Sequence, residues 1–371
     1  MSTTTAPTAG TIPDPVSTHD RIGVILMAYG TPRTRDEILP YYTDIRRGRP
    51  PTDEQLADLV ARYEAIAPPG SDILSPLAAR TEAQRDALQA ALDAIIPGRY
   101  QVALGLKHAA PMIEDTVADF AAQGFRRLVG LVLAPHYSSY SIGQYIDRAR
   151  TAAEPHGIEV VGVDSWATEP AYIDFLADDL RGRLADMPAD TKVLFTAHSL
   201  PQRIIDTGDP YPDELRATAE AVAARVGLAE WSQWAIAWQS AGRTPEPWLG
   251  PDILQVIDDL AASESSATER GVVVSACGFV ADHLEVLYDL DIEAAHRARG
   301  HGLAFDRTAC VNDDPTVMAA LARRVVAARG PAPCEPQPAP RVSRLSAAAS
   351  AALRLHIDCS PWPPRPASRS R

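Results

Sequence analysis

The chain has 371 residues, of which 46% are hydrophobic and 22% charged, a globular balance that excludes a wholly disordered protein. Its 35 Lys and Arg against 48 Asp and Glu give a formal net charge of −13, which argues against a general binder of nucleic acid or anionic membranes. No stretch approaches the roughly 18 apolar residues of a membrane span, and the polar first residues lack the basic and apolar regions of a secretory signal. We therefore expect a cytoplasmic protein without integral membrane association.

Three zones of composition follow one another along the chain. Residues 1–20 are rich in Thr, Pro and Ser, and residues 330–371 are rich in Pro, Ala and Arg, so we expect both to be disordered tails. Between them, residues 21–329 alternate short β-branched runs with longer stretches of helical period. We expect this part to form two α/β lobes, residues 21–165 and residues 166–329.

The expected strands are short apolar runs closed by turn residues, at 22–30, 101–106, 127–135, 158–165, 191–198, 233–240 and 271–276. Stretches of helical period cover about 55–66, 76–96, 112–123, 169–186, 210–226, 251–261, 283–299 and 314–328. Strands that are apolar throughout and alternate with helices indicate a parallel sheet covered on both faces. Because the pattern runs through twice, the sequence predicts two doubly wound, Rossmann-like lobes with a cleft between them.

Residues that follow the strands are the first candidates for a binding site, because ligands of such folds bind at the carboxyl ends of the strands. The predicted strand exits carry Tyr29, Lys107, His108, His136 and His198. No G-x-G-x-x-G follows a strand and no G-x-x-x-x-G-K-[ST] occurs, so the usual dinucleotide and P-loop fingerprints are missing. The cleft is therefore expected to take a different ligand.

His198 ends the apolar run VLFTAH. A neutral imidazole at a strand exit can accept a proton or bind a metal near pH 7. A lone histidine is more often a buried residue with satisfied hydrogen bonds, so His198 by itself is weak evidence.

Glu285, Asp289 and Glu293 recur every four residues in an otherwise apolar stretch. This spacing keeps the carboxylates on nearly one helix face, and a stretch of π-helix would align them further. Such a row of oxygen ligands could guide a divalent cation inward. An acidic, solvated helix face would look the same, and the spacing leaves both readings open.

Two loops and the cysteines complete the candidates. Arg46, Arg47 and Arg49 in YYTDIRRGRP suit bidentate contacts to carboxylates, although a solvated basic loop is the commoner outcome. The stretch WQSAGRTPEPWLG, with Gln239, could line a cleft or simply pack as a loop.

The four cysteines contain no close pair, so they predict no zinc or iron–sulfur site; they are Cys277, Cys310, Cys334 and Cys359. The features together are compatible with a site where a cation meets a large, carboxylated, apolar ring such as a porphyrin.

The motifs closely resemble those of the ferrochelatases, in particular the coproporphyrin III type of Gram-positive and actinobacterial lineages. The resemblance runs from about residue 21 to residue 329. It rests on MAYGTP, YYTDIRRGRP, RYEAI, SPL, GLKH, LAPHYSSYSIGQY, AHSLP, GDPYPDEL, WQSAGRTPEPWLGPD and GFVADHLEVLYDLD, in this order. It implies a chelatase-like fold with a porphyrin cleft, and a lyase that inserts ferrous iron into coproporphyrin III to form coproheme on the way to heme b.

The resemblance also implies roles for individual residues. His198 and Glu285 match the catalytic positions that bind the metal and handle protons, and Tyr29 matches a tyrosine that can coordinate the product iron from the opposite side. The positions around the macrocycle and its propionates are matched by Arg46, Arg62, Tyr63, Ser75, Lys107, His108 and Tyr145. Asp289 and Glu293 match the carboxylates that extend from Glu285 along a π-helical stretch.

No organic cofactor is implied, Fe²⁺ enters as a substrate, and transient contact with a coproheme decarboxylase is suggested. Some relatives carry a [2Fe–2S] cluster on four cysteines, but this chain lacks their pattern and we expect no cluster. The chain departs from the family pattern in the loop before Ser75 and at Ser275, Ala276 and Cys277. The alternatives are a protoporphyrin IX ferrochelatase, a chelatase of a sirohydrochlorin-like ring and a non-catalytic coproheme carrier.

Overall fold

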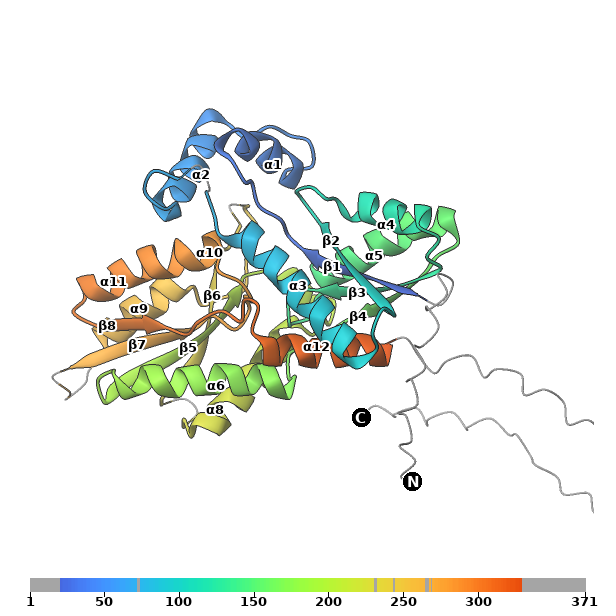
Figure 1. Ribbon diagram of the computed structural model, residues 1–371. Coiled ribbons are helices and arrows are strands. Elements are labelled where there is room, and N and C mark those ends of the chain that lie inside the picture. The colour runs from blue at the N-terminus through green and yellow to red at the C-terminus, as the bar shows by residue number, and fades with distance from the viewer. Residues whose placement is uncertain are drawn as a thin grey trace, which may run out of the picture. The chain divides into compact units, whose positions relative to one another are not determined.

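The computed structural model describes residues 21–71, 74–229, 232–242, 244–263, 267 and 269–328. The first half of the chain forms the first of two sheets (Figure 1). Its strands are β1 (Ile22–Ala28), β2 (Tyr100–Leu106), β3 (Arg127–Val132) and β4 (Glu159–Val163). All pairs are parallel, and the strand order is β2-β1-β3-β4. The predicted N-terminal and C-terminal tails lie outside the described residues.

The second sheet repeats this topology. Its strands are β5 (Asp190–His198), β6 (Trp234–Gln239), β7 (Arg270–Ser275) and β8 (Ala304–Arg307), in the parallel order β6-β5-β7-β8. The predicted α/β class with two doubly wound parallel sheets is confirmed. Strand β8 was not predicted, because its four residues are only half-buried and end in Asp306 and Arg307, so they form no apolar run.

Helices cover the faces of both sheets (Figure 1). They are α3 (Leu77–Ile95), α4 (Ile113–Ala122), α5 (Ile142–Ala153), α6 (Pro170–Ala185), α8 (Tyr211–Val226), α9 (Ile253–Ala262) and α12 (Pro315–Ala328), with short turns η3 (Glu154–His156) and α7 (Arg203–Asp206). The stretch predicted as one helix over 283–299 consists of α10 (Leu284–Leu287), the π-helix η4 (Asp289–Ala294) and α11 (Ala295–Gly300). None of the described helices is both long and apolar enough to cross a membrane.

Beyond the carboxyl end of β1, the chain forms η2 (Arg35–Glu37), α1 (Ile38–Ile45) and α2 (Asp53–Ile66). Helices α1 and α2 pack against each other at the top of Figure 1, and α2 also contacts α10. A capping box starts α2: the Thr52 hydroxyl accepts from the Gln55 N–H at 3.2 Å, and the Gln55 side chain accepts from the Thr52 N–H at 3.1 Å. This pair satisfies donors that an uncapped helix start would leave open. Helix α2 carries the candidates Arg62 and Tyr63 in its last turn.

One hydrophobic core extends through both sheets. It contains Val24 and Leu26 of β1, Val193 and Phe195 of β5, and side chains from α3, α6, α8 and α12. Helix α12, the last described element, packs against α3 and α6 and therefore joins the two halves of the chain. The described residues belong to one compact unit.

Candidate active site

Each sheet reverses its strand order next to its first strand. Strand β1 lies between β2 and β3, and strand β5 lies between β6 and β7. The crevice outside the carboxyl ends at such a reversal is where open α/β sheets bind ligands. Tyr29 directly follows β1 and His198 ends β5, so the two candidates occupy equivalent places in the two sheets.

His198 and Glu285 meet in the structure. The Nε2 atom of His198 lies 3.6 Å from Oε1 of Glu285, and both side chains are partly exposed. The Nδ1 atom of His198 is 2.5 Å from the carbonyl oxygen of Ser199. Because a carbonyl only accepts, Nδ1 carries a proton, and Nε2 is the ring nitrogen that faces Glu285. This pair can accept a proton and supply two ligands to one metal ion.

His283 is a third member that the sequence reasoning missed. Its Nε2 lies 4.0 Å from Oε2 of Glu285, and its Nδ1 donates to the Ala281 carbonyl at 2.8 Å. Burial lowers the pKa of His283, so the imidazole is neutral near pH 7. The residue stands two positions before Glu285 in GFVADHLE, but the regular spacing of the carboxylates in that motif does not include it.

The row of carboxylates continues from Glu285 into a π-turn, as the resemblance implied. Asp289 is the first residue of η4 and only 7% exposed, whereas Glu293 near its end is largely exposed. Burial raises the pKa of Asp289 to about 6, against the lowering effects of a hydrogen bond from Ser240 and of the Arg62 charge. A carboxyl group at this position therefore changes its charge close to neutral pH.

The Arg62 guanidinium is engaged with this row. It forms an ion pair with Asp289, lies 4.0 Å from Oε2 of Glu293, and stacks 4.5 Å above the Tyr288 ring. The resemblance placed Arg62 around the macrocycle. The structure shows it paired with acidic residues of the π-helix η4.

Two tyrosines lie in ring contact beyond the carboxyl end of β1. Tyr29 is 44% exposed, and its ring centroid lies 6.5 Å from that of Tyr41 and 4.5 Å from that of His108. The Tyr41 hydroxyl donates to the Gly30 carbonyl at 3.1 Å, and His108 Nδ1 lies 2.6 Å from the Asp44 carboxylate. Tyr41 was not singled out, although it opens the YYTDIRRGRP motif.

The charge of Glu285, from the second half of the chain, acts on three tyrosines of the first half. Burial raises the pKa of Tyr63 to about 12, and it also raises the pKa values of Tyr29 and Tyr145. The negative charge of Glu285 adds to each of these upward shifts.

A basic corner lies beside Tyr145. The Lys107 ammonium is 5.0 Å from the Tyr145 ring centroid and donates to the Gln144 side chain at 2.8 Å. Arg148 donates to the Lys107 carbonyl at 2.8 Å, and two of its nitrogens bind both carboxylate oxygens of Glu114. The corner offers positive charge to an anionic ligand.

Two predicted porphyrin contacts, Arg46 and Ser75, and one strand exit, His136, have other partners in the structure. Arg46 stacks 5.6 Å from the Tyr42 ring centroid and bonds to the Arg49 carbonyl at 3.2 Å. Ser75 is buried, and its hydroxyl accepts from the Leu77 N–H at 3.3 Å. His136 is also buried, with Nε2 2.8 Å from the Thr218 hydroxyl.

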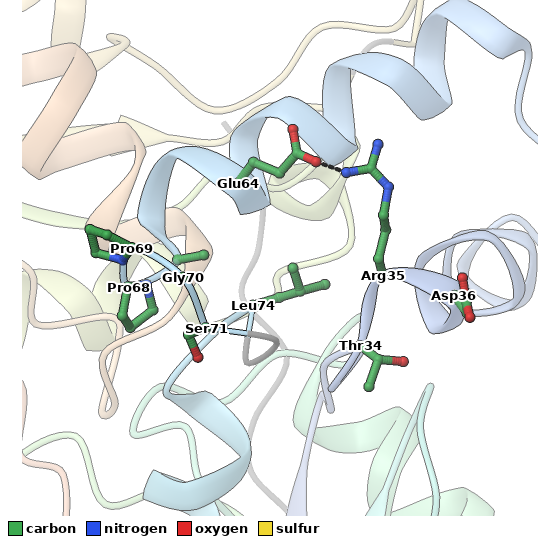
Figure 2. A pocket seen from close by; sticks show the side chains of 10 residues that line it. Thr34, Arg35, Asp36, Glu64, Pro68, Pro69, Gly70, Ser71 and Leu74 are labelled. Atoms are coloured by element: carbon green, nitrogen blue, oxygen red, sulfur yellow. Dashed lines mark ion pairs between the residues drawn. The ribbon is translucent and has the colours of Figure 1, made fainter.

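A pocket of about 530 Å³ lies between the approach to α1 and the loop after α2, where the sequence departs from the family pattern (Figure 2). The loop residues that line it are Ala67, Pro68, Pro69, Gly70 and Ser71. Arg35 and Glu64 form an ion pair at its wall, as Figure 2 shows. None of the predicted site residues lines this pocket.

Comparisons with known proteins agree with the motifs. The sequence model of the ferrochelatase family matches residues 21–329. A ferrochelatase of Herpetosiphon aurantiacus is 44% identical over 302 residues, which cover 80% of this chain and 95% of the relative. The coproporphyrin III ferrochelatase of Oceanobacillus iheyensis is 42% identical and covers 82% of this chain and 96% of its own length. That of Geobacillus kaustophilus is 43% identical, with 82% of this chain and 95% of the relative covered.

Proposed function

Because the chain belongs to the ferrochelatase family, we propose that it is a coproporphyrin III ferrochelatase, a lyase that inserts ferrous iron into coproporphyrin III to form coproheme. The observation that carries the proposal is the pair His198 and Glu285, 3.6 Å apart at the carboxyl end of the second sheet. Relatives named as coproporphyrin III ferrochelatases match over 82% of the chain, which supports this porphyrin over protoporphyrin IX.

The pair fits the chemistry of metal insertion. A flat porphyrin keeps its N–H groups and nitrogen lone pairs in the ring plane, where a metal ion cannot reach them. A cleft that binds a buckled ring exposes these groups and therefore favours a geometry close to the transition state. His198 would accept pyrrole protons at Nε2, because its Nδ1 is already hydrogen-bonded. The Glu285 carboxylate would replace water around the arriving Fe²⁺. Tyr29 would coordinate the product iron from the other face of the ring.

The basic corner suits the propionates of the substrate. Coproporphyrin III carries a propionate on each pyrrole ring, and Lys107 and Arg148 offer cationic groups beside Tyr145. We assign Arg46, Arg62, Tyr63, Ser75, His108 and Tyr145 to the same ring and its propionates.

The remaining assignments follow from the family. We propose that the protein works in the cytoplasm without an organic cofactor or a [2Fe–2S] cluster, and that it passes coproheme to a decarboxylase by transient contact. The free cysteines Cys277 and Cys310 are buried, and burial raises the pKa of both thiols to about 12, which disfavours the thiolates that clusters need. Cys334 and Cys359 lie outside the described residues.

An anaerobic assay tests the function. Purified protein receives Fe²⁺ with either coproporphyrin III or protoporphyrin IX, and the porphyrin absorbance is followed. We expect a strong preference for coproporphyrin III. The His198→Ala variant should bind coproporphyrin III with nearly unchanged affinity but metalate it at least about a hundredfold more slowly, because it lacks the proton acceptor.

Other outcomes separate the alternatives. Preference for protoporphyrin IX would keep the chemistry at His198 and Glu285 but change the substrate. Binding of coproheme without turnover of either porphyrin would indicate a carrier. Near-normal turnover by the His198→Ala variant would remove His198 from the mechanism.

A further inference from the structure

Gln239 ends β6 beside the proposed metal-binding pair. In the parallel register of β5 and β6 it is the partner of His198, and its carbonyl accepts the Ser199 N–H at 2.8 Å. Its side chain is only 1% exposed. The main chain of Gln239 is therefore tied to the strand that presents His198.

The side chain of Gln239 reaches the other member of the pair. Its Nε2 donates to the main-chain carbonyl of Glu285 at 2.8 Å. One residue thus contacts the backbone beside His198 through its main chain and the backbone of Glu285 through its carboxamide. His198 and Glu285 are far apart in the sequence, and Gln239 connects them through two hydrogen bonds of ordinary length.

The bond from Nε2 to Glu285 is the one hydrogen bond that the Gln239 carboxamide makes among the described residues. The Oε1 atom of Gln239 is buried and has no hydrogen-bond partner among the described residues. A buried, unpaired carbonyl oxygen is unfavourable, and an apolar side chain of the same length would avoid it. What the amide supplies that such a side chain cannot is the directed bond from Nε2 to Glu285.

Ser240, the residue after Gln239, makes a second contact with the segment that carries Glu285 and Asp289. Ser240 has a positive φ of 58°, and its hydroxyl donates to Oδ2 of Asp289 at 2.5 Å. The end of β6 therefore contacts the acidic segment at the start of α10, through Gln239, and at the start of η4, through Ser240. Removal of the Gln239 contact would leave the Glu285 backbone without its link to the β5–β6 pair.

We propose that Gln239 is a positioning residue for metal insertion: its carboxamide fixes the main chain of Glu285 relative to His198, so that both side chains meet the same metal ion. This inference rests on the proposed function. Gln239 does not touch the substrate in this scheme. It acts through Glu285, because small errors in the placement of reacting groups lower catalytic rates strongly.

The Gln239→Met variant tests the proposal in the full chain, because methionine nearly keeps the length and volume but cannot donate. With Fe²⁺ and coproporphyrin III, we expect kcat to fall about tenfold and the KM for Fe²⁺ to rise, while the KM for the porphyrin stays within about twofold. Gln239→Asn, which keeps the amide but is too short to reach, should give the same pattern. The Gln239→Asn variant also tests the proposal if the Gln239→Met variant does not fold.

Gln84 provides a matched control. It is a fully buried glutamine of α3 whose Oε1 also lacks a partner among the described residues. Its Nε2 donates to the carbonyls of Val280 and Asn312, at 3.2 and 2.9 Å, and to neither member of the pair. The Gln84→Met variant removes the same kind of contact, so its thermal midpoint should fall as much or more, but its kcat should stay within about twofold of the wild type.

The outcomes are distinguishable. Normal kcat in both Gln239 variants, with the wild type active, would overturn the positioning role and leave the proposed function standing. Equal losses of kcat in the Gln239 and Gln84 variants would also overturn it, since they would indicate a general structural effect. A wild type that metalates neither porphyrin would overturn the proposed function and this inference together.

Discussion

Lys107 carries a positive charge that is lost not far above neutral pH. Burial and, to a smaller extent, the nearby charges of Arg148 and Arg47 lower its pKa to about 8. The protonated ammonium is the form that attracts a propionate. A binding site that depends on this charge must therefore weaken when the pH rises above about 8.

This gives a pH prediction for substrate binding. The affinity of the wild type for coproporphyrin III should be constant below about pH 7 and fall by up to about tenfold per pH unit above pH 8, because the free Lys107 loses its proton there. The Lys107→Arg variant keeps its charge, since arginine titrates above about pH 12. Its affinity should stay level to about pH 9.5. Porphyrin fluorescence titrations measure the affinities of the wild type and of the Lys107→Arg variant at each pH. Parallel pH curves for the two proteins would contradict the role of Lys107.

The sequence predicted the centre of the candidate site better than its surroundings. His198 and the tyrosine after β1 were identified because strand exits are visible as the ends of apolar runs. The partner of Arg62 could not be foreseen, because Asp289 is 227 positions away and no local pattern encodes such a contact. His283 was visible in its motif, but a lone histidine carries no spacing signal of its own.

The π-turn η4 is held from the side opposite Asp289. The Nε and Nη2 atoms of Arg307, at the end of β8, bind both carboxylate oxygens of Asp291, at 2.6 and 2.9 Å. The same Nη2 lies 3.5 Å from Asp282, shortly before Glu285. Since π-helical turns are rare and less favourable than α-helical ones, this bidentate pair is a specific stabilising contact for the turn.

A double-mutant cycle tests that role. Arg307→Gln and Asp291→Asn should each lower kcat for Fe²⁺ insertion by about threefold to tenfold, because the turn that carries Asp289 and Glu293 loses its anchor. The double variant should be no worse than the more impaired single variant. Circular dichroism checks that all three proteins fold. Losses that multiply in the double variant would mean that the two residues act separately.

Element prediction failed where the pattern was short or interrupted. Strand β8 has four half-buried residues, and its alternating polarity is too brief to recognise. Helix α1 contains Pro40, which breaks a helical pattern in the sequence. In the structure Pro40 lies in the first turn, where its missing N–H would have no helical partner anyway. Helix α5, with 12 residues, was also not predicted. For the other long segments, most predicted ends lie within about two residues of the observed ends.

At the scale of the molecule, the two sheets share one core. The sequence predicts lobes at 21–165 and 166–329, and the repeated strand pattern makes this division natural. It gives no sign that α12, the last helix, packs on α3 of the first half. Hydrophobic periodicity identifies a buried face but not the element that covers it.

A single substitution in α12 should therefore weaken both sheets. Leu321→Ala, at a fully buried position of the shared core, should lower the free energy of unfolding by about 2 to 5 kcal/mol. Hydrogen exchange should show β1 and β5 losing protection by the same amount. Ile95→Ala, at an exposed position at the end of α3, should change stability by at most about 0.5 kcal/mol. Loss of protection in β5 alone would indicate that the halves unfold independently.

The place of α12 also bears on how the protein emerges from the ribosome. The first sheet and α3 are complete well before Pro315 is translated, yet α3 buries Leu88 and Leu92 in the same core as Val317 and Leu321. During translation, the apolar face of α3 that packs against α12 therefore stays uncovered until the second half of the chain has been made. Chains interrupted before α12 would present that surface to chaperones and proteases, so quality control acts on nearly the whole length of the polypeptide.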